Sequence, residues 1–294
     1  MPEFEVTIPT DPALGGTLIV PDRARAFVLL HQGGGVHDRD GNMHAVGFKS
    51  SLYRRVAQLL AARGIATLRF DKRGHDKPAP YPQTYTCWQR VEDARAALGV
   101  LRQHAGNAPV YLAGHSEGGM VVGKLAEGEA VAGVAQLCSP LRNIFEVGRW
   151  RAHRLAQHTD ATQRAKGKQA VEYYARLEEY FKQGTKLAPE DFVELGKGYP
   201  AAYSGWESYE WLAGHWANAL QAEPRVRTLV VQGGRDARLT DDNIAQWQDW
   251  CEARPPAELH VIEHLGHDLN DARQKLFRVD EGLIDLLANW LVQA

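Results

Sequence analysis

A serine flanked by glycines, at the junction of an apolar strand and a helix, is the feature that most constrains this sequence. Residues 109–115 read as a buried strand, Ser116 is the centre of a G-x-S-x-G motif, and residues 120–126 are helix-like. Such a strand-to-helix turn needs glycines, because side chains at those positions would collide with the neighbouring strand and helix. The following helix N-terminus favours negative charge on a reacting oxygen. Ser116 is therefore a candidate nucleophile rather than a plain turn residue.

A serine hydroxyl is a weak nucleophile, so a base and an orienting acid are expected elsewhere in the chain. Residues 227–232 form a second apolar strand, and Asp236 follows its end. Residues 258–262 form a third strand, and His267 lies in the glycine-containing loop after it. The order Ser, Asp, His is that of one serine-hydrolase architecture. All three residues fall beyond the ends of predicted parallel strands, where open α/β sheets place their sites.

Other residues compete for the acid and base positions. Asp241 and Asp242 follow a threonine and fit better in the first turn of a helix. His264 is the alternative base, but Gly266 gives His267 the tighter loop. The pair His264-x-x-His267 lacks the helical H-E-x-x-H pattern of a zinc site. We predict the catalytic set to be Ser116, Asp236 and His267, with no metal.

An oxyanion hole needs two backbone donors close to the serine. Residues 26–30 form a strand that ends in the glycine-rich turn 33–35, where the backbone can approach a substrate oxygen closely. We predict the N–H groups of Glu117 and Gly34 as the donors, with Gly33 as the alternative to Gly34.

Three motifs carry a resemblance to a known family. Residues 33–42 approximate G-x-G-x-x-D-R-D-G-N, residues 69–74 read R-F-D-K-R-G, and residues 114–119 read G-H-S-E-G-G. The chain resembles the α/β-hydrolase superfamily, and within it a bacterial esterase-like subgroup, over residues 15–140 and 225–294. The resemblance implies an α/β-hydrolase fold: a mostly parallel sheet with helices on both faces and an inserted helical lid.

The chain departs from the subgroup in two places. Residues 73–78 lack a glycine of the usual R-G-x-G-K-S, and Gly34 and Val36 stand where Ser and Pro are common. The pocket wall and the oxyanion turn are expected to differ there. The resemblance also implies a structural ion-pair network behind the oxyanion loop, made by Asp38, Arg39 and Asp40 with Asp71 and Arg73 as partners.

The order of elements agrees with this fold. Strands alternate with helices at crossover-length connections, which predicts a parallel sheet covered on both faces. Residues 1–140 and 223–294 are expected to form the core. The predicted strands are 4–9, 16–21, 26–30, 65–70, 109–115, 131–137, 227–232 and 258–262, and the predicted helices are 50–63, 86–103, 120–126, 241–251 and 283–291.

Residues 141–222 interrupt the alternation and read as a helical cap, or lid, over Ser116. They hold 13 of the 26 Phe, Tyr and Trp residues of the chain. These aromatics either form the small core of the lid or line an apolar substrate pocket, for which Trp206 and Trp211 are candidates. Arginines and lysines in the first part of the segment form a solvated helix face or a contact for an anionic group.

Composition narrows the class of protein. The net charge of −2 gives no general attraction to nucleic acid. No apolar run approaches the roughly 20 residues of a membrane span, and the first residues lack the regions of a signal peptide. Three widely spaced cysteines, Cys87, Cys138 and Cys251, indicate reduced thiols and a cytoplasmic location, without a structural zinc.

The sequence therefore predicts a serine esterase. It would hydrolyse a small-molecule carboxylic ester through an acyl-enzyme, and this chemistry needs no cofactor. An acyl thioesterase or acyltransferase is the alternative, because the acyl-enzyme is common to all of them. A peptidase and a non-catalytic binding module are further alternatives.

Overall fold

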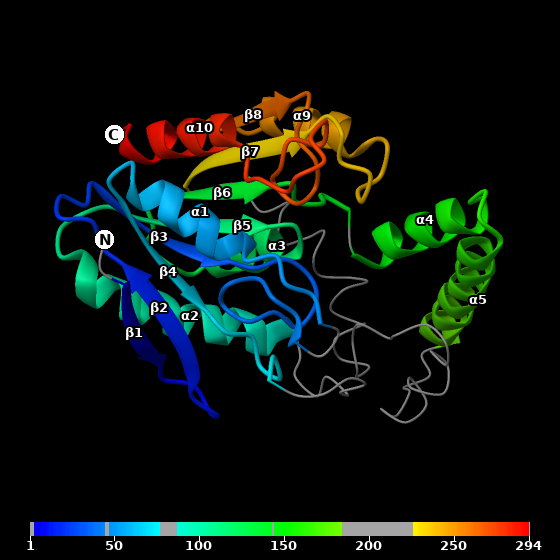
Figure 1. Cartoon of the computed structure of the whole chain (residues 1–294), viewed down its shortest axis with the longest axis horizontal. Helices are drawn as coiled ribbons and strands as arrows, with labels where there is room; N and C mark the ends of the chain where they lie inside the picture. The colour runs from blue at the N-terminus through cyan, green and yellow to red at the C-terminus, as the bar shows by residue number, and fades with distance from the viewer. Residues whose placement is uncertain (1–2, 45–46, 77–86, 143, 184–225, 294) are drawn as a thin grey trace.

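One eight-stranded sheet forms the centre of the molecule (Figure 1). The computed structural model describes residues 3–44, 47–76, 87–142, 144–183 and 226–293. Along the sheet the strand order is β1-β2-β4-β3-β5-β6-β7-β8. The bounds are β1 (Glu3–Ile8), β2 (Leu14–Ile19), β3 (Ala26–His31), β4 (Ile65–Phe70), β5 (Val110–His115), β6 (Gly133–Leu137), β7 (Arg227–Gly233) and β8 (Ala257–Ile262).

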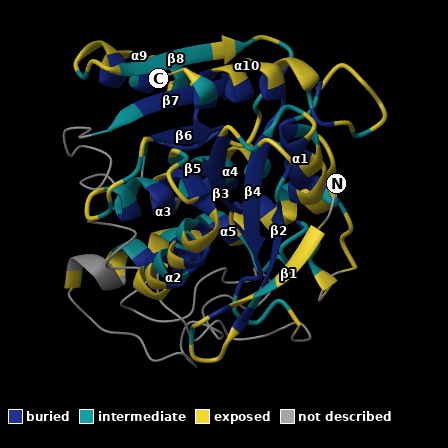
Figure 2. Cartoon of the chain, turned by 90° about the vertical axis from the view of Figure 1, so that its left-hand side faces the viewer, coloured by how far each residue is buried: buried dark blue, intermediate teal, exposed yellow. Residues whose placement is uncertain are grey.

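The sheet is parallel except at its N-terminal end. β1 and β2 form an antiparallel hairpin, and β2 also runs antiparallel to β4. The other neighbouring strands, from β4 to β8, are parallel. Every residue of β3, β4 and β6 is buried, as expected for strands covered on both faces (Figure 2). The predicted mostly parallel sheet is confirmed.

Helices cover the two faces of the sheet and divide the core in two. On one face α1 and α10 pack against residues such as Val28 and Val231. On the other face α2, α3 and α9 pack against residues such as Leu29 and Val230. The bounds are α1 (Leu52–Ala61), α2 (Cys87–Ala105), α3 (Glu117–Ala126), α9 (Asn243–Glu252) and α10 (Glu281–Val292).

The predicted core elements are all present, with small shifts at their ends. α1 begins only at Leu52, because Ser51 has a left-handed φ of 51°. α10 begins after Asp280, whose carboxylate accepts a hydrogen bond from the amide of Leu283 over 2.8 Å. On that helix Leu286 is only partly buried, whereas Ile284, which the predicted apolar face omitted, is fully buried.

Two further helices, α4 (Ile144–Ala156) and α5 (Ala161–Gln183), project from the side of the molecule where the parallel strands end (Figure 1). They pack on each other through buried residues that include Val147, Tyr173 and Leu177. The guanidinium of Arg151 donates to the carbonyl oxygen of Arg238 in the core over 2.6 Å. This bond gives the predicted basic run a structural contact.

The rest of the predicted lid, including Trp206 and Trp211, lies outside the described residues. The lid itself stays a prediction. Within the described ranges, no helix is both long and apolar enough to cross a membrane.

Candidate active site

Ser116 occupies a strained turn between β5 and α3. Its backbone has φ 53° and ψ −124°, a region that side chains other than glycine rarely adopt. The turn is held by hydrogen bonds from the amide of Ser116 to the carbonyl of Leu137 and from the amide of Gly119 to the carbonyl of Ser116. A methyl group on Gly114 would overlap the backbone of Gly118. The close approach that the sequence indicated is present.

The structure brings Ser116, His267 and Asp236 together. Nε2 of His267 lies 3.0 Å from Oγ of Ser116, and Nδ1 of His267 lies 2.7 Å from Oδ2 of Asp236. A carboxylate only accepts, so Nδ1 carries the proton and Nε2 accepts from the serine hydroxyl. Both Ser116 and His267 are only 7% exposed. The arrangement is able to move a proton from the serine to the imidazole.

The competing residues lie elsewhere. Nε2 of His264 bonds to the carboxylate of Asp280 over 2.7 Å, at the start of α10. Asp242 pairs with Arg142, whose hydrogen bond holds the pKa of that carboxyl well below its ordinary value. Asp241 lies 3.5 Å from the guanidinium of Arg154 on α4. These contacts give the three competitors structural partners.

The glycine loop after β3 lies against Ser116. A methyl group on Gly33 would be 3.2 Å from Cβ of the serine. The amide of Gly33, the alternative donor, already donates to Oη of Tyr53 over 2.7 Å. Gly34 is exposed and stays our candidate, together with the amide of Glu117 at the first position of α3. In the described part of the chain, no cluster of His, Cys, Asp or Glu has the arrangement of a metal site.

Comparison with known proteins decides the family. Residues 27–279 match the sequence pattern of the alpha/beta hydrolase family over most of the chain. The chain belongs to this family. The parallel sheet with its antiparallel β2 is the alpha/beta-hydrolase fold, as the resemblance implied.

Two esterases and a peptidase match nearly the whole chain. Esterase EstD of Thermotoga maritima is 27% identical over 301 residues, which cover 99% of this chain and 68% of EstD. The Pyrococcus furiosus esterase PF2001 has a TM-score of 0.61 at 17% identity. Its match covers 99% of this chain and 90% of the esterase chain. For proline iminopeptidase of Mycobacterium smegmatis the TM-score is 0.59 at 15% identity, and the match covers 98% of this chain and 97% of the peptidase chain. At these identities the two solved structures establish the fold.

A tyrosine absent from the sequence-based site contacts two parts of this alpha/beta hydrolase site. Oη of Tyr53, on α1, lies 2.9 Å from Nδ1 of His115 as well as bonding the amide of Gly33. The phenol is buried, and a buried tyrosine hydroxyl usually has a partner. The position of Tyr53 on the inward face of an amphipathic helix was the available signal. The pattern predicts its burial but does not identify its partner.

A second missed residue is Arg90 of α2. Its guanidinium forms an ion pair with the carboxylate of Glu117, and the two side chains are 3% and 1% exposed. The pair holds the side chain of the residue that follows Ser116. The sequence feature that could have indicated Arg90 was Glu117 at a position expected to be buried, because a buried carboxylate needs a cationic partner.

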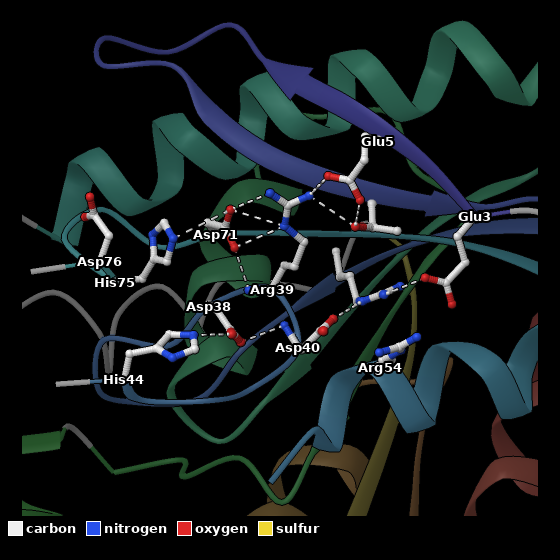
Figure 3. A pocket seen from close by; sticks show the side chains of 12 residues that line it. Glu3, Glu5, Asp38, Arg39, Asp40, His44, Arg54, Asp71, His75 and Asp76 are labelled. Atoms are coloured by element: carbon white, nitrogen blue, oxygen red, sulfur yellow. Dashed lines mark hydrogen bonds and ion pairs between the residues drawn. The ribbon is translucent and has the colours of Figure 1, made fainter. Parts of the chain in front are cut away.

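The predicted ion-pair network lines an open pocket of about 590 Å³ (Figure 3). Arg39 bonds Asp71 through both its guanidinium and its amide, each over 2.7 Å. Asp40 accepts from Arg69 over 2.9 Å. Asp38 instead accepts from the backbone and side chain of the turn that follows it.

One partner of that network was predicted wrongly. Arg73 forms a bidentate pair with Asp93 of α2, over 2.7 and 2.8 Å, and is no part of the Asp38–Asp40 turn. Because α2 packs beside the end of β4, its carboxylate is nearer to Arg73 than the turn is.

Proposed function

We propose that the protein is a serine hydrolase that cleaves carboxylic esters of small molecules. The observation that carries the proposal is the hydrogen-bonded series from Ser116 Oγ to His267 Nε2 and from His267 Nδ1 to Asp236, at 3.0 and 2.7 Å. The strained backbone of Ser116 supports it, since such strain gathers at functional sites. The esterase name of the EstD relative supports an ester substrate.

In the proposed mechanism the three side chains act in sequence. His267 takes the proton of Ser116 as its oxygen attacks the ester carbonyl, and Asp236 holds the imidazole tautomer and stabilises its cation. The amides of Gly34 and Glu117 stabilise the oxyanion. The alcohol leaves with the proton from His267, and water then hydrolyses the acyl-enzyme by the same steps. The residues named supply every proton transfer, so the scheme uses no cofactor.

We propose that residues 141–222 form the lid of this site. Support comes from α4 and α5, which project on the side where β5, β7 and β8 end and where Ser116, Asp236 and His267 follow them (Figure 1). Trp206 and Trp211 are the proposed pocket residues. Membership of the bacterial esterase-like subgroup is part of the proposal, supported by the roles of its signature residues in the network around Arg39. A cytoplasmic location is also proposed, supported by the free thiols of Cys138 and Cys251.

A panel of substrates tests the reaction class. p-Nitrophenyl esters of increasing acyl length are compared with acyl-CoA and aminoacyl-anilide substrates, with Ser116→Ala as the control. We expect the highest kcat/KM for one of the esters and no turnover by Ser116→Ala. A preference for acyl-CoA would indicate a thioesterase or acyltransferase, and a preference for the anilide a peptidase. No turnover of any substrate would indicate a binding module.

A further inference from the structure

Lys72 places a buried ammonium next to the glycine loop of the candidate site. The residue follows β4 and is only 4% exposed. Its Nζ donates hydrogen bonds to the carbonyl oxygen of Gly33 and, over 3.1 Å, to that of Gly35. Burying an ammonium is costly, so such a cation is retained where its hydrogen bonds matter.

We propose that Lys72 is a positioning residue of the oxyanion hole. Its ammonium fixes the carbonyl groups on either side of Gly34, so that the amide of Gly34 faces the reacting carbonyl at Ser116. The inference rests on the proposed function and adds a residue that does not itself touch the substrate.

The geometry of the peptide bond links Lys72 to the amide of Gly34. In a planar trans peptide the C=O of one residue and the N–H of the next point in opposite directions. Since Lys72 holds the carbonyl of Gly33, it turns the amide of Gly34 to the opposite side of the peptide plane. Gly33 itself lies against Ser116. The direction of the Gly34 amide is thereby set by the contact of Lys72 with the carbonyl of Gly33.

The loop needs such contacts because it contains three successive glycines. Glycine has no side chain whose packing could fix the peptide planes, and Gly35 has a positive φ of 94°. The neighbouring groups are held in the same way. The amide of Gly33 donates to Tyr53 over 2.7 Å, and the carbonyl of Gly34 accepts from Nε2 of His37 over 2.7 Å.

The charge of Lys72 adds to the effect of its geometry. A cation bound to the carbonyl of Gly33 polarises the peptide and strengthens its N–H as a donor. The charge acts on its surroundings: burial together with the neighbouring Lys72 lowers the pKa of His31 to about 3 and that of His37 to about 4. Both imidazoles are therefore neutral at pH 7.

The test compares Lys72→Met with the matched control Lys124→Met, which removes an ammonium on α3 that pairs with Glu127. For each variant kcat and KM are measured on the best ester. Affinity is measured for two ligands: a trifluoromethyl ketone, which forms a tetrahedral adduct on the serine, and the carboxylate product. Circular dichroism checks the fold.

We expect Lys72→Met to lower kcat about 10- to 100-fold, somewhat less than the loss of an oxyanion donor itself, with KM nearly unchanged. Affinity for the ketone should fall in proportion, while affinity for the carboxylate and the rates of Lys124→Met stay as in wild type. Lys72→Arg keeps a donor cation and should recover part of the loss. If Lys72→Met does not fold, Lys72→Arg tests the inference instead. We expect the ratio of its ketone affinity to its carboxylate affinity to be lower than in wild type.

Two results would overturn the inference alone. One is a folded Lys72→Met with wild-type kcat and ketone affinity; the other is an equal loss of affinity for both ligands, which is the mark of a merely structural role. If Lys72→Met does not fold, a ratio of ketone to carboxylate affinity in Lys72→Arg that equals the wild-type ratio would also overturn the inference. Wild-type protein that cleaves no ester and takes no phosphonate on Ser116 would instead contradict the proposed function.

Discussion

Nε2 of His115 donates a hydrogen bond to the backbone carbonyl oxygen of His267 over 2.7 Å. A carbonyl only accepts, so Nε2 carries the proton and Nδ1 accepts from the hydroxyl of Tyr53. That hydroxyl in turn accepts from the amide of Gly33. One chain of hydrogen bonds thus joins the glycine loop after β3 to the loop of the proposed base, and His115, the residue before Ser116, is its centre.

Tyr53→Phe tests this chain. The substitution leaves the amide of Gly33 and Nδ1 of His115 buried without their partner, which should lower the free energy of unfolding by about 1–3 kcal/mol. We also expect a lower kcat, because two loops of the site lose their connection. Urea denaturation and ester kinetics measure both effects. Tyr111→Phe, on the far part of β5, is the control, and equal effects of the two variants would count against the chain.

Acid should destabilise the protein through buried histidines. Burial lowers the pKa of His31 to about 3, that of His37 to about 4 and that of His115 well below its ordinary value. In the unfolded chain all three titrate near pH 6.5, so below that pH the unfolded state binds more protons. Stability is then full above pH 6.5 and falls as the pH drops, with a slope approaching about 4 kcal/mol per pH unit for the three groups.

Urea denaturation between pH 8 and pH 5 measures this slope, in a range where most carboxylates have not yet begun to titrate. His31→Gln should reduce the slope by about one third, whereas His104→Gln, on the exposed side of α2, should leave it unchanged. An unfolding free energy that is constant from pH 8 to pH 5 would contradict the prediction.

The ion pair between Arg90 and Glu117 should matter far more than the surface pairs. Arg90→Met removes the guanidinium that forms the buried ion pair with Glu117 beside the turn of Ser116, and we expect a loss of about 3–5 kcal/mol in unfolding free energy. Arg95→Met, which removes a partly exposed partner of Glu92 and Glu129, should cost about 1 kcal/mol or less. Adding Glu117→Gln to Arg90→Met should restore part of the stability. Equal losses in the two single variants would contradict the account.

The parts of the site that local sterics dictate were predictable from the sequence. Only glycine fits at Gly114 and Gly118, so the G-x-S-x-G pattern alone predicts the turn around Ser116. Asp236 and His267 follow strand ends, and parallel strands bring their carboxyl ends to one edge. The choice of His267 over His264 rested on one glycine; in the structure His267 contacts Ser116, whereas His264 contacts Asp280.

The contacts that depend on packing between distant elements were not predictable. Arg90 meets Glu117 only because α2 packs beside α3, and Arg73 meets Asp93 for a similar reason. A hydrophobic pattern assigns Tyr53 to an inward face without saying which polar atom it meets. The spacing of residues along the sequence indicates which neighbouring residues interact. It does not determine which distant residue a long polar side chain will contact.

The aromatic residues of the proposed lid have a test of their own. If Trp206 and Trp211 line the pocket, replacing either with alanine should change the relative kcat/KM among ester chain lengths by about 1–3 kcal/mol per contact. If they form the core of the lid, the variants should lose thermal stability while their chain-length profiles stay parallel to wild type. Parallel profiles for both variants would remove their role in specificity.

Labelling with a fluorophosphonate, followed by peptide mass spectrometry, tests the central claim most directly. The reagent reacts with a serine that a neighbouring base has activated. We expect a single adduct, on Ser116, that is lost in Ser116→Ala, nearly absent in His267→Ala and retained in His264→Ala. An adduct on a different serine, or an unmodified Ser116 in folded wild-type protein, would contradict the assignment of Ser116 as the nucleophile and His267 as its base.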